Sequence, residues 1–209
     1  MKALIAGALS TTPRASPTNT PDAFDFSSAT LYKSDGDILE IKVPSGWQSA
    51  PSTGQNGERT FTFNYGDSGA AAVNVQIQIV NAASLWTNID ATGKADSPEA
   101  ALQSIINANS SPQAGSPAIK FSPILSVMIG NLPGKGFIGD IPAGTQPEFQ
   151  VDIRIALLGR GRALYVSAHS NADLWAKAQP IINQMFDSVR INLQNIPTAT
   201  VTPTPHPCI

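Results

Sequence analysis

Apolar and polar residues alternate in several short runs of the chain, which is the pattern of strands that bury one face and wet the other. In the run 73–80, Val and Ile take the odd positions, while Asn and Gln take most of the even ones. The run 59–65 carries aromatic residues at alternate positions. These runs predict an antiparallel sheet with one apolar face and one face in contact with water.

Turn-forming residues separate the strand-like runs. Residues 29–33 and 38–43 flank Ser34-Asp35-Gly36-Asp37, a cluster that predicts a hairpin turn. Pro44-Ser45-Gly46-Trp47 ends the second strand, because proline lacks a ladder donor and glycine permits the bend. Later strands are expected at 123–129, continuing to 141 after a Gly-rich break, at 149–158 and at 163–168, with Gly159–Arg162 as the turn between the last two.

Two stretches have helical spacing. Ser97-Pro98-Glu99 predicts a helix start, with Ser as N-cap, Pro in the first turn and Glu near the positive end of the dipole, and Pro112 ends the helix. A second helix is expected over 172–189, where apolar residues form one stripe. Pro180 lies inside it and predicts a kink or a break after a short first turn.

The expected order is four strands, a helix, three strands and a helix. Strands and helices do not alternate regularly enough for a doubly wound parallel sheet. The sequence therefore predicts an α+β fold, a mostly antiparallel sheet of about six to seven strands with two main helices packed on it. About 170 residues remain when both ends are set aside, which is enough for one core without a metal or disulfide.

The two ends differ from the middle of the chain. Met1–Ala8 ends in small residues of the kind that signal peptidase accepts, and it resembles the lipobox of bacterial lipoproteins, with Ala8 where the acylated cysteine would stand. Thr/Pro-rich segments follow this start and also close the chain, and such segments favour extended spacers. We expect a residual signal-like segment at 1–8, a tether at 9–26, one domain at 27–193 and a Thr/Pro-rich tail at 194–209.

Three segments of the expected domain resemble the PsbP-like family, the α-β-α sandwich of the photosystem subunit PsbP and of bacterial DcrB-type lipoproteins. They are the strand 38–43 with its Pro44-Ser45-Gly46-Trp47 ending, the strand pair 149–168, and the last helix from Leu174-Trp175 to Phe186-Asp187-Ser188-Val189. The resemblance covers about residues 27–193. It implies an exported, non-enzymatic binding or assembly module, and it assigns no metal or subunit contact to individual residues.

Charge and cysteine content exclude several classes of protein. Charged residues make up 13% of the chain, the net charge is −2, and the longest basic cluster is the pair Arg160 and Arg162. A nucleic-acid binder or a polybasic membrane binder would show a clustered positive footprint. The one cysteine, Cys208, closes no internal disulfide, and one Cys with two His does not build a zinc site. No apolar stretch approaches the roughly 20 residues that span a bilayer.

Few residues have the pattern of a catalytic or ligand-binding site. His169 is a candidate general base, yet no Gly-x-Ser-x-Gly segment exposes a serine, and a capping or solvated histidine is the favoured interpretation. Asp35 and Asp37 lack the remaining ligands of a calcium loop. The segment 132–136, Leu-Pro-Gly-Lys-Gly, does not lead into a helix as a phosphate-binding loop does. The sequence thus predicts no catalytic, cofactor or metal site.

Three residues are candidates for contact with a partner. Arg160 and Arg162 are expected at a hairpin tip, where they would meet an acidic partner or sugar, with a solvated turn as the alternative. Trp86 is expected between a strand and the first helix, either exposed at a contact site or packed as a lid over the sheet edge.

The leading hypothesis is a non-catalytic extracytoplasmic module, secreted, periplasmic or tethered to the cell surface, that binds another protein. The alternatives are a structural subunit of an extracellular or membrane-associated assembly, docking by edge strands or tails, and a hydrolase that uses His169. Composition and pattern leave the partner and the oligomeric state open.

Overall fold

A computed structural model describes residues 24–54, 57–66, 73–90, 95–111, 118–143 and 148–198. The signal-like segment 1–8, most of the expected tether, the end of the tail and Cys208 lie outside these residues. Within them, no helix is long and apolar enough to cross a membrane.

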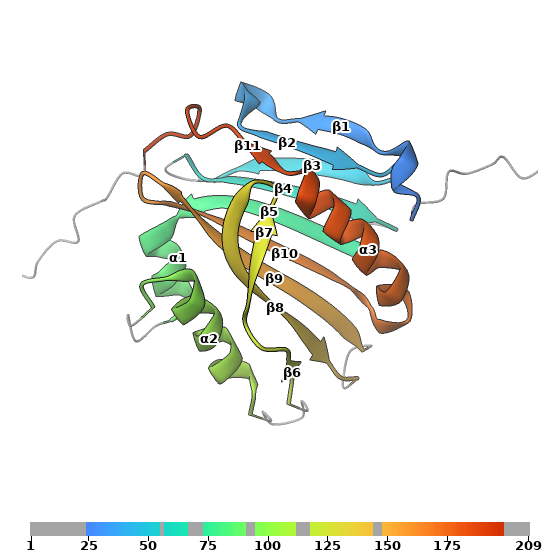
Figure 1. Cartoon of the computed structure of the whole chain (residues 1–209), viewed down its shortest axis with the longest axis vertical. Coiled ribbons are helices and arrows are strands. Elements are labelled where there is room, and N and C mark those ends of the chain that lie inside the picture. Colours follow the sequence, from blue (N-terminus) through green and yellow to red (C-terminus); the bar gives the residue numbers. More distant parts are fainter. Residues whose placement is uncertain are drawn as a thin grey trace, which may run out of the picture.

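The described residues contain one large sheet of eight strands (Figure 1). Its strands are β3 (Gln48–Thr53), β4 (Arg59–Tyr65), β5 (Val73–Asn81), β6 (Lys120–Phe121), β7 (Leu125–Ile129), β8 (Leu132–Ile141), β9 (Phe149–Gly159) and β10 (Arg162–Asn171). They follow the order β3-β4-β5-β10-β9-β8-β6, and β7 pairs with β8 outside this path. Each of these pairings is antiparallel.

A second sheet is small and is made from both ends of the domain. It consists of β1 (Thr30–Lys33), β2 (Leu39–Val43) and β11 (Arg190–Ile191), in the order β1-β2-β11. Short 3-10 turns lie at Phe26–Ser28 and Asp35–Asp37, and the latter forms the predicted turn between β1 and β2. Strand β2 therefore pairs with both the first and the last strand of the domain.

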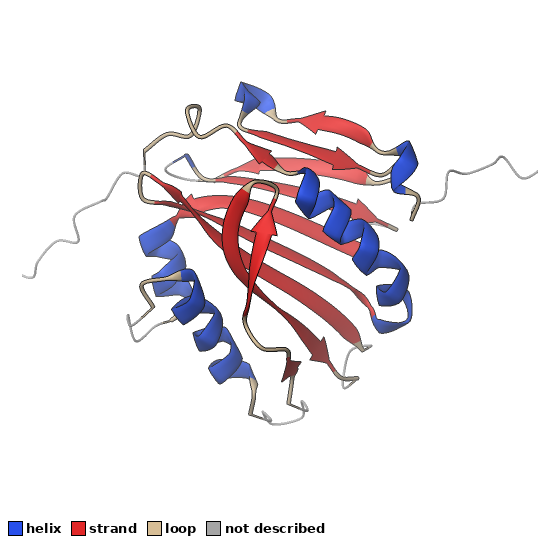
Figure 2. Ribbon diagram, in the orientation of Figure 1, coloured by secondary structure: helices blue, strands red, loops and turns tan. Residues whose placement is uncertain are grey.

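Helices and the small sheet cover the large sheet on its two faces (Figure 2). On one face, helix α3 (Ala172–Ser188) and the small sheet bury the larger core, which includes the odd-numbered residues of β5 and the apolar stripe of α3. On the other face, helices α1 (Ala82–Ile89) and α2 (Pro98–Asn109) cover a smaller core over β8 and β9. The arrangement is an α-β-α sandwich.

The predicted fold class is confirmed, with four differences in its elements. The sheet has eight strands in place of six to seven, and α1 is a third helix, where the sequence predicts a connection around Trp86. β3 was also not expected, because all six of its residues are exposed and show no alternation. Helix α3 continues through Pro180, so of the two predicted effects, a kink or a break, the break is wrong.

Candidate functional site

A groove of about 690 Å³ lies between the start of α2 and the β7–β8 hairpin. One wall is the first turn of α2, and the other is the hairpin. The lining residues are Ser97, Pro98, Glu99, Ser126, Val127, Met128, Pro133, Gly134, Lys135 and Leu157. The volume lies in the range of ordinary ligand and side-chain pockets.

Strand pairing explains how the hairpin forms its wall. Ser126 lies opposite Lys135, and Met128 lies opposite Pro133, so these four side chains share one face of the hairpin. Gly134 allows close packing there, because an added Cβ would lie 2.5 Å from the carbonyl oxygen of Ile155. The pairing of β8 with β9 begins at Gly134 and Ala156, so Leu157 of β9 lies beyond it and faces the groove.

Exposed apolar side chains gather at this groove. Five large apolar side chains of the described residues are exposed, and two of them, Met128 (49%) and Leu157 (53%), line the groove. A third, Leu125, begins strand β7 and lies on its opposite face. Clustered exposed apolar groups mark contact sites more often than single ones do.

Polar groups border the apolar surface. Lys135 Nζ forms an ion pair with Glu99 Oε2 at 3.1 Å, which links the two walls. Ser97 caps α2, and its hydroxyl accepts a hydrogen bond from the Ala100 N–H. The charges balance within the groove, so it has no strong preference for an anion or a cation. Its chemistry is that of an interface with an apolar centre and a polar rim.

A second, smaller hollow of about 400 Å³ lies between the small sheet and the end of α3. Leu31 is its exposed apolar residue, and charged side chains from both elements surround it, including Glu40 of the small sheet and Asp187 of α3. Ser188 joins these elements, since its hydroxyl accepts the Lys42 N–H and donates to the Met185 carbonyl. These two hydrogen bonds give the serine near the end of α3 a structural role.

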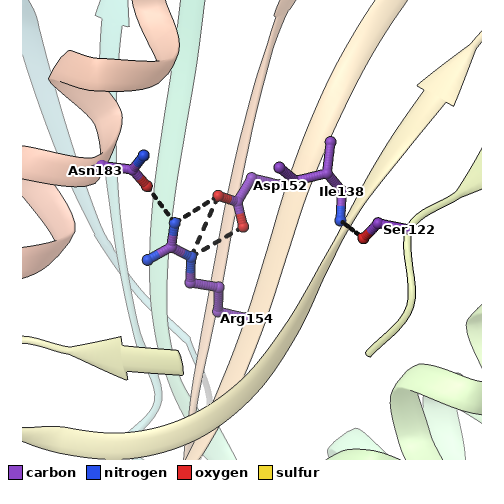
Figure 3. Close-up of polar contacts among 5 residues, drawn as sticks. All are labelled: Ser122, Ile138, Asp152, Arg154 and Asn183. Carbon is purple, nitrogen blue, oxygen red and sulfur yellow. Dashed lines mark hydrogen bonds and ion pairs between the residues drawn. The ribbon is translucent and has the colours of Figure 1, made fainter. Parts of the chain in front are cut away.

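A buried charged cluster lies beneath α3 (Figure 3). Arg154 donates three hydrogen bonds to the Asp152 carboxylate, from Nε at 3.0 Å and 3.2 Å and from Nη2 at 2.7 Å, and a fourth to the Asn183 side-chain oxygen. Its guanidinium also lies 4.6 Å from the centre of the Phe186 ring. Because these partners belong to the protein itself, the cluster fixes α3 on the sheet and offers no charge to a ligand.

Arg160 and Arg162 lie on the β9–β10 hairpin, as the sequence predicts, and both reach the C-terminal segment. Arg160 Nη1 donates to the Ile196 carbonyl at 3.3 Å, and Arg162 Nε donates to the Pro197 carbonyl at 3.0 Å. Arg162 is 1% exposed, and Ile196 is buried with it. The segment 194–198, expected within the tail, therefore packs on the domain. A contact of these arginines with a partner stays a prediction.

Trp86 lies on α1 and is partly buried against the smaller core. Asn81 starts this helix, since its side-chain oxygen accepts the Ala83 and Ser84 N–H groups. The Ala82 N–H donates to the Gly161 carbonyl, so α1 begins beside the turn that carries the two arginines. A partner contact of Trp86 also stays a prediction.

His169 lies near the end of β10 with its ring 6.2 Å from that of Phe149. Partial burial lowers the pKa of this imidazole below its usual value. The Ser170 hydroxyl donates to the Asn171 carbonyl instead of to His169. Within the described residues no group of three His, Cys, Asp or Glu side chains is placed to hold a metal ion, and Asp35 and Asp37 belong to a turn.

Sequence reasoning missed the groove itself. It singled out 132–136 as a glycine-rich bend, and this segment is a strand that forms one wall. Leu157 continues the apolar face of β9, so the alternation of apolar and polar residues does not predict that its side chain is exposed. Met128 carried a weak signal, because 125–129 has four apolar residues in five and no clear polar face.

No protein-family model matches the chain, and no curated protein matches it in sequence. Among solved structures, the Ran-binding protein Mog1p of Saccharomyces cerevisiae is similar with a TM-score of 0.51 and 9% identity, over 81% of this chain and 98% of that one. The chain thus has a Mog1p-like fold. At this identity the similarity concerns the fold alone.

Two further solved structures are similar at lower scores. The cyanobacterial PsbP of Synechocystis has a TM-score of 0.48 and 13% identity, over 87% of this chain and all of that one. LpqN of Mycobacterium tuberculosis, involved in cell envelope biogenesis, has a TM-score of 0.49 and 12% identity, over 78% of this chain and 90% of that one.

Proposed function

We propose that the chain is a non-catalytic extracytoplasmic module that binds another protein through the groove between α2 and the β7–β8 hairpin. The observation that carries the proposal is the exposure of Met128 and Leu157 inside a groove with a balanced polar rim. Interfaces gain most of their affinity from a few apolar anchors in a desolvated centre. The occupant is an apolar side chain on a protruding loop or helix of the partner.

The groove determines the chemistry of that partner segment. A charged group at its centre would be desolvated against Met128 and Leu157 without an unpaired counter-charge, because Lys135 and Glu99 already satisfy each other. The partner is therefore expected to present a Leu, Met or aromatic residue at the centre, with polar neighbours that reach the ion pair at the rim.

The first test identifies the partner by contact and then measures affinity. A photo-crosslinking amino acid at position 128 is compared with one at Leu193, an exposed apolar residue outside the groove. A protein that is crosslinked only from position 128 is purified, and its Kd is measured with wild type, Leu157→Glu and the control Leu193→Glu. We expect Leu157→Glu to weaken binding at least about 30-fold, the effect of losing one interface anchor. Equal affinity of all three forms would refute the groove as the site.

The second test concerns export. Cys208 is the one thiol of the chain, so a maleimide that does not cross membranes reports where this residue lies. Extracytoplasmic display predicts labelling on intact cells, with none in Cys208→Ser. Labelling that requires rupture of the cytoplasmic membrane, and not only of an outer membrane, would contradict export.

The structural-subunit hypothesis differs in oligomeric state. Light scattering after size-exclusion chromatography distinguishes the two, because a subunit assembles with itself and a binding module stays monomeric at high protein concentration. Strand β3 is an open edge of the large sheet, but Pro51 interrupts its donors and discourages pairing with another edge.

A further inference from the structure

Helices α1 and α2 cover only part of one face of the large sheet, and polar side chains line another part of this face. These two helices pack mainly over β5, β10, β8 and β9, toward one side of the sheet (Figure 2). Twelve positions on four neighbouring strands form what we call the polar grid. They are Gln48, Ala50 and Ser52 on β3, Thr60, Thr62 and Asn64 on β4, Asn74, Gln76 and Gln78 on β5, and Tyr165, Ser167 and His169 on β10.

Strand register sets these residues in three straight rows. Ala50, Thr62, Gln76 and Ser167 are consecutive cross-strand partners, and the rows on either side run from Gln48 to His169 and from Ser52 to Tyr165. Given the usual strand spacing and rise, the polar grid covers about 14 Å in each direction. All twelve side chains are exposed or partly exposed.

The polar grid contains no Asp, Glu, Lys or Arg. His169 is its one titratable group near neutral pH, and partial burial lowers the pKa of His169. The surface is therefore uncharged at pH 7. An uncharged surface gives no electrostatic affinity for nucleic acid, anionic lipid or an acidic polymer.

Hydrogen bonds within the polar grid hold its amides in fixed orientations. Asn74 Nδ2 donates to Asn64 Oδ1 at 2.6 Å, and Gln78 Nε2 donates to Gln76 Oε1. Among the residues that the structure describes, the amide nitrogens of Asn64 and Gln76 then remain as donors, while the side-chain oxygens of Asn74 and Gln78 remain as acceptors. Donors and acceptors thus lie side by side on a preorganised surface, which lowers the entropy cost of binding a polar ligand.

A polyhydroxylated ligand matches this surface better than a protein does. Each hydroxyl group both donates and accepts, as the amides and hydroxyls of the polar grid require. Protein interfaces instead concentrate Trp, Tyr, Met and Arg at their centre, and the centre of the polar grid has Thr62 and Gln76. Aromatic rings occur only at its edge, where Phe149 meets His169 and Tyr165 lies partly buried.

We propose that the polar grid is a second binding site, and that its ligand is an uncharged polysaccharide. The chain of sugars lies across the strands, its hydroxyls bonded to the amides of β4 and β5. The Phe149–His169 pair offers an apolar ring edge to the sugar ring at one end. The site is separate from the groove, which is formed by α2, β7, β8 and β9.

The experiment measures retardation of the purified chain in native gels that contain dextran, laminarin or hydroxyethyl cellulose, with the anionic polymer alginate as a comparison. We expect retardation by at least one neutral polymer and none by alginate. The double variant Thr62→Ala and Gln76→Ala is expected to weaken the apparent affinity roughly tenfold, the usual effect of losing two hydrogen-bonding side chains. Gln184→Ala, at an exposed glutamine of α3 outside the polar grid, is the control and should behave as wild type.

Unchanged circular dichroism melting curves establish that the variants fold. No retardation by any of the three neutral polymers would overturn the proposal, as would retardation that persists in the double variant. If Gln76→Glu releases the protein partner of the groove while no polymer binds, the polar grid is a protein contact and the proposal is wrong. Salt leaves the expected binding unchanged, because no charge takes part.

Discussion

Arg154 and Asp152 lie two residues apart on β9, and their side chains form an ion pair of 2.7 Å between Nη2 and Oδ2 beneath α3. The Asp152 side chain is almost fully buried, and the Arg154 side chain is 12% exposed. The pair meets Asn183 and Phe186 of α3 on its outer side. Strand β9 and helix α3 are thus joined through an ion pair whose two charged groups are largely shielded from water.

Removal of one partner should destabilise the fold strongly. Asp152→Ala leaves the Arg154 guanidinium buried without its counter-charge, and we expect a loss of about 3–5 kcal/mol in the free energy of unfolding. Urea denaturation gives this value, with Glu148→Ala, an exposed carboxylate, as the control within about 0.5 kcal/mol. The combined change Asp152→Leu and Arg154→Met should cost less than Asp152→Ala. Equal effects of Asp152→Ala and Glu148→Ala would contradict the role of the pair.

Gly130 and Gly159 make a matched pair for close packing. Both have a positive φ, +59° and +78°, but an added Cβ at Gly130 would lie 1.8 Å from the Val189 carbonyl oxygen, while nothing lies within 4 Å at Gly159. Gly159→Ala should cost about 1–2 kcal/mol, the strain of the left-handed region alone. Gly130→Ala should cost clearly more, because the turn is also held to α3 by its N–H bond to Phe186 at 2.7 Å. If urea denaturation gives similar losses of unfolding free energy for the two variants, the turn at Gly130 moves away from the Val189 carbonyl at little cost.

The sequence predicts the fold well where local patterns and packing agree. The alternation at 73–80 and the capped start at Ser97 each correspond to an observed element, because the same residues that prefer the conformation also bury the apolar face. In α3, Pro180 predicts a kink or a break, but the helix does not break, because burial of Ile181, Ile182 and Phe186 outweighs one lost hydrogen bond.

The sequence does not predict α1 or the groove. Helix α1 has eight residues and no charged side chain, so its signal is weak, and Asn81 becomes a visible cap only once the helix is known. Met128, Leu157 and Pro98 come from three elements that meet only through the topology. A strand pattern gives the face of a residue, but it does not reveal that β8 separates from β9 and leaves Leu157 uncovered.

Arg162 should hold the C-terminal segment on the domain. Its Nε bond to Pro197 and its burial predict that Arg162→Met lowers the free energy of unfolding by about 2–3 kcal/mol, since the Pro197 carbonyl loses a charge-assisted donor. Arg160→Ala removes a longer bond from an exposed residue and should cost under about 1 kcal/mol. Limited proteolysis gives a second measurement, since cleavage near Ile196 should become faster in Arg162→Met. Cleavage at the wild-type rate would show that the segment is held by Ile196 alone.

His169 should make stability depend on pH in the weakly acidic range. Because burial lowers the pKa of His169 in the folded state, the unfolded chain takes up the proton first as the pH falls. The contribution of His169 to stability is therefore fully present well above pH 6.5, and it is lost as the pH falls through the lowered pKa. His169→Gln should remove this part of the pH dependence, measured as the urea midpoint at pH 7.5, 6.5 and 5.5.

NMR measures directly whether folding lowers or raises the pKa of His169. In His206→Gln the remaining imidazole is that of His169, and its Cε1–H shift should titrate below the value of the same protein in urea. A neutral polymer bound at the polar grid would bury the ring further and lower the pKa of His169 again, whereas an anionic ligand would raise it. A folded pKa above the unfolded one would contradict both the burial of the ring and the uncharged character of this face.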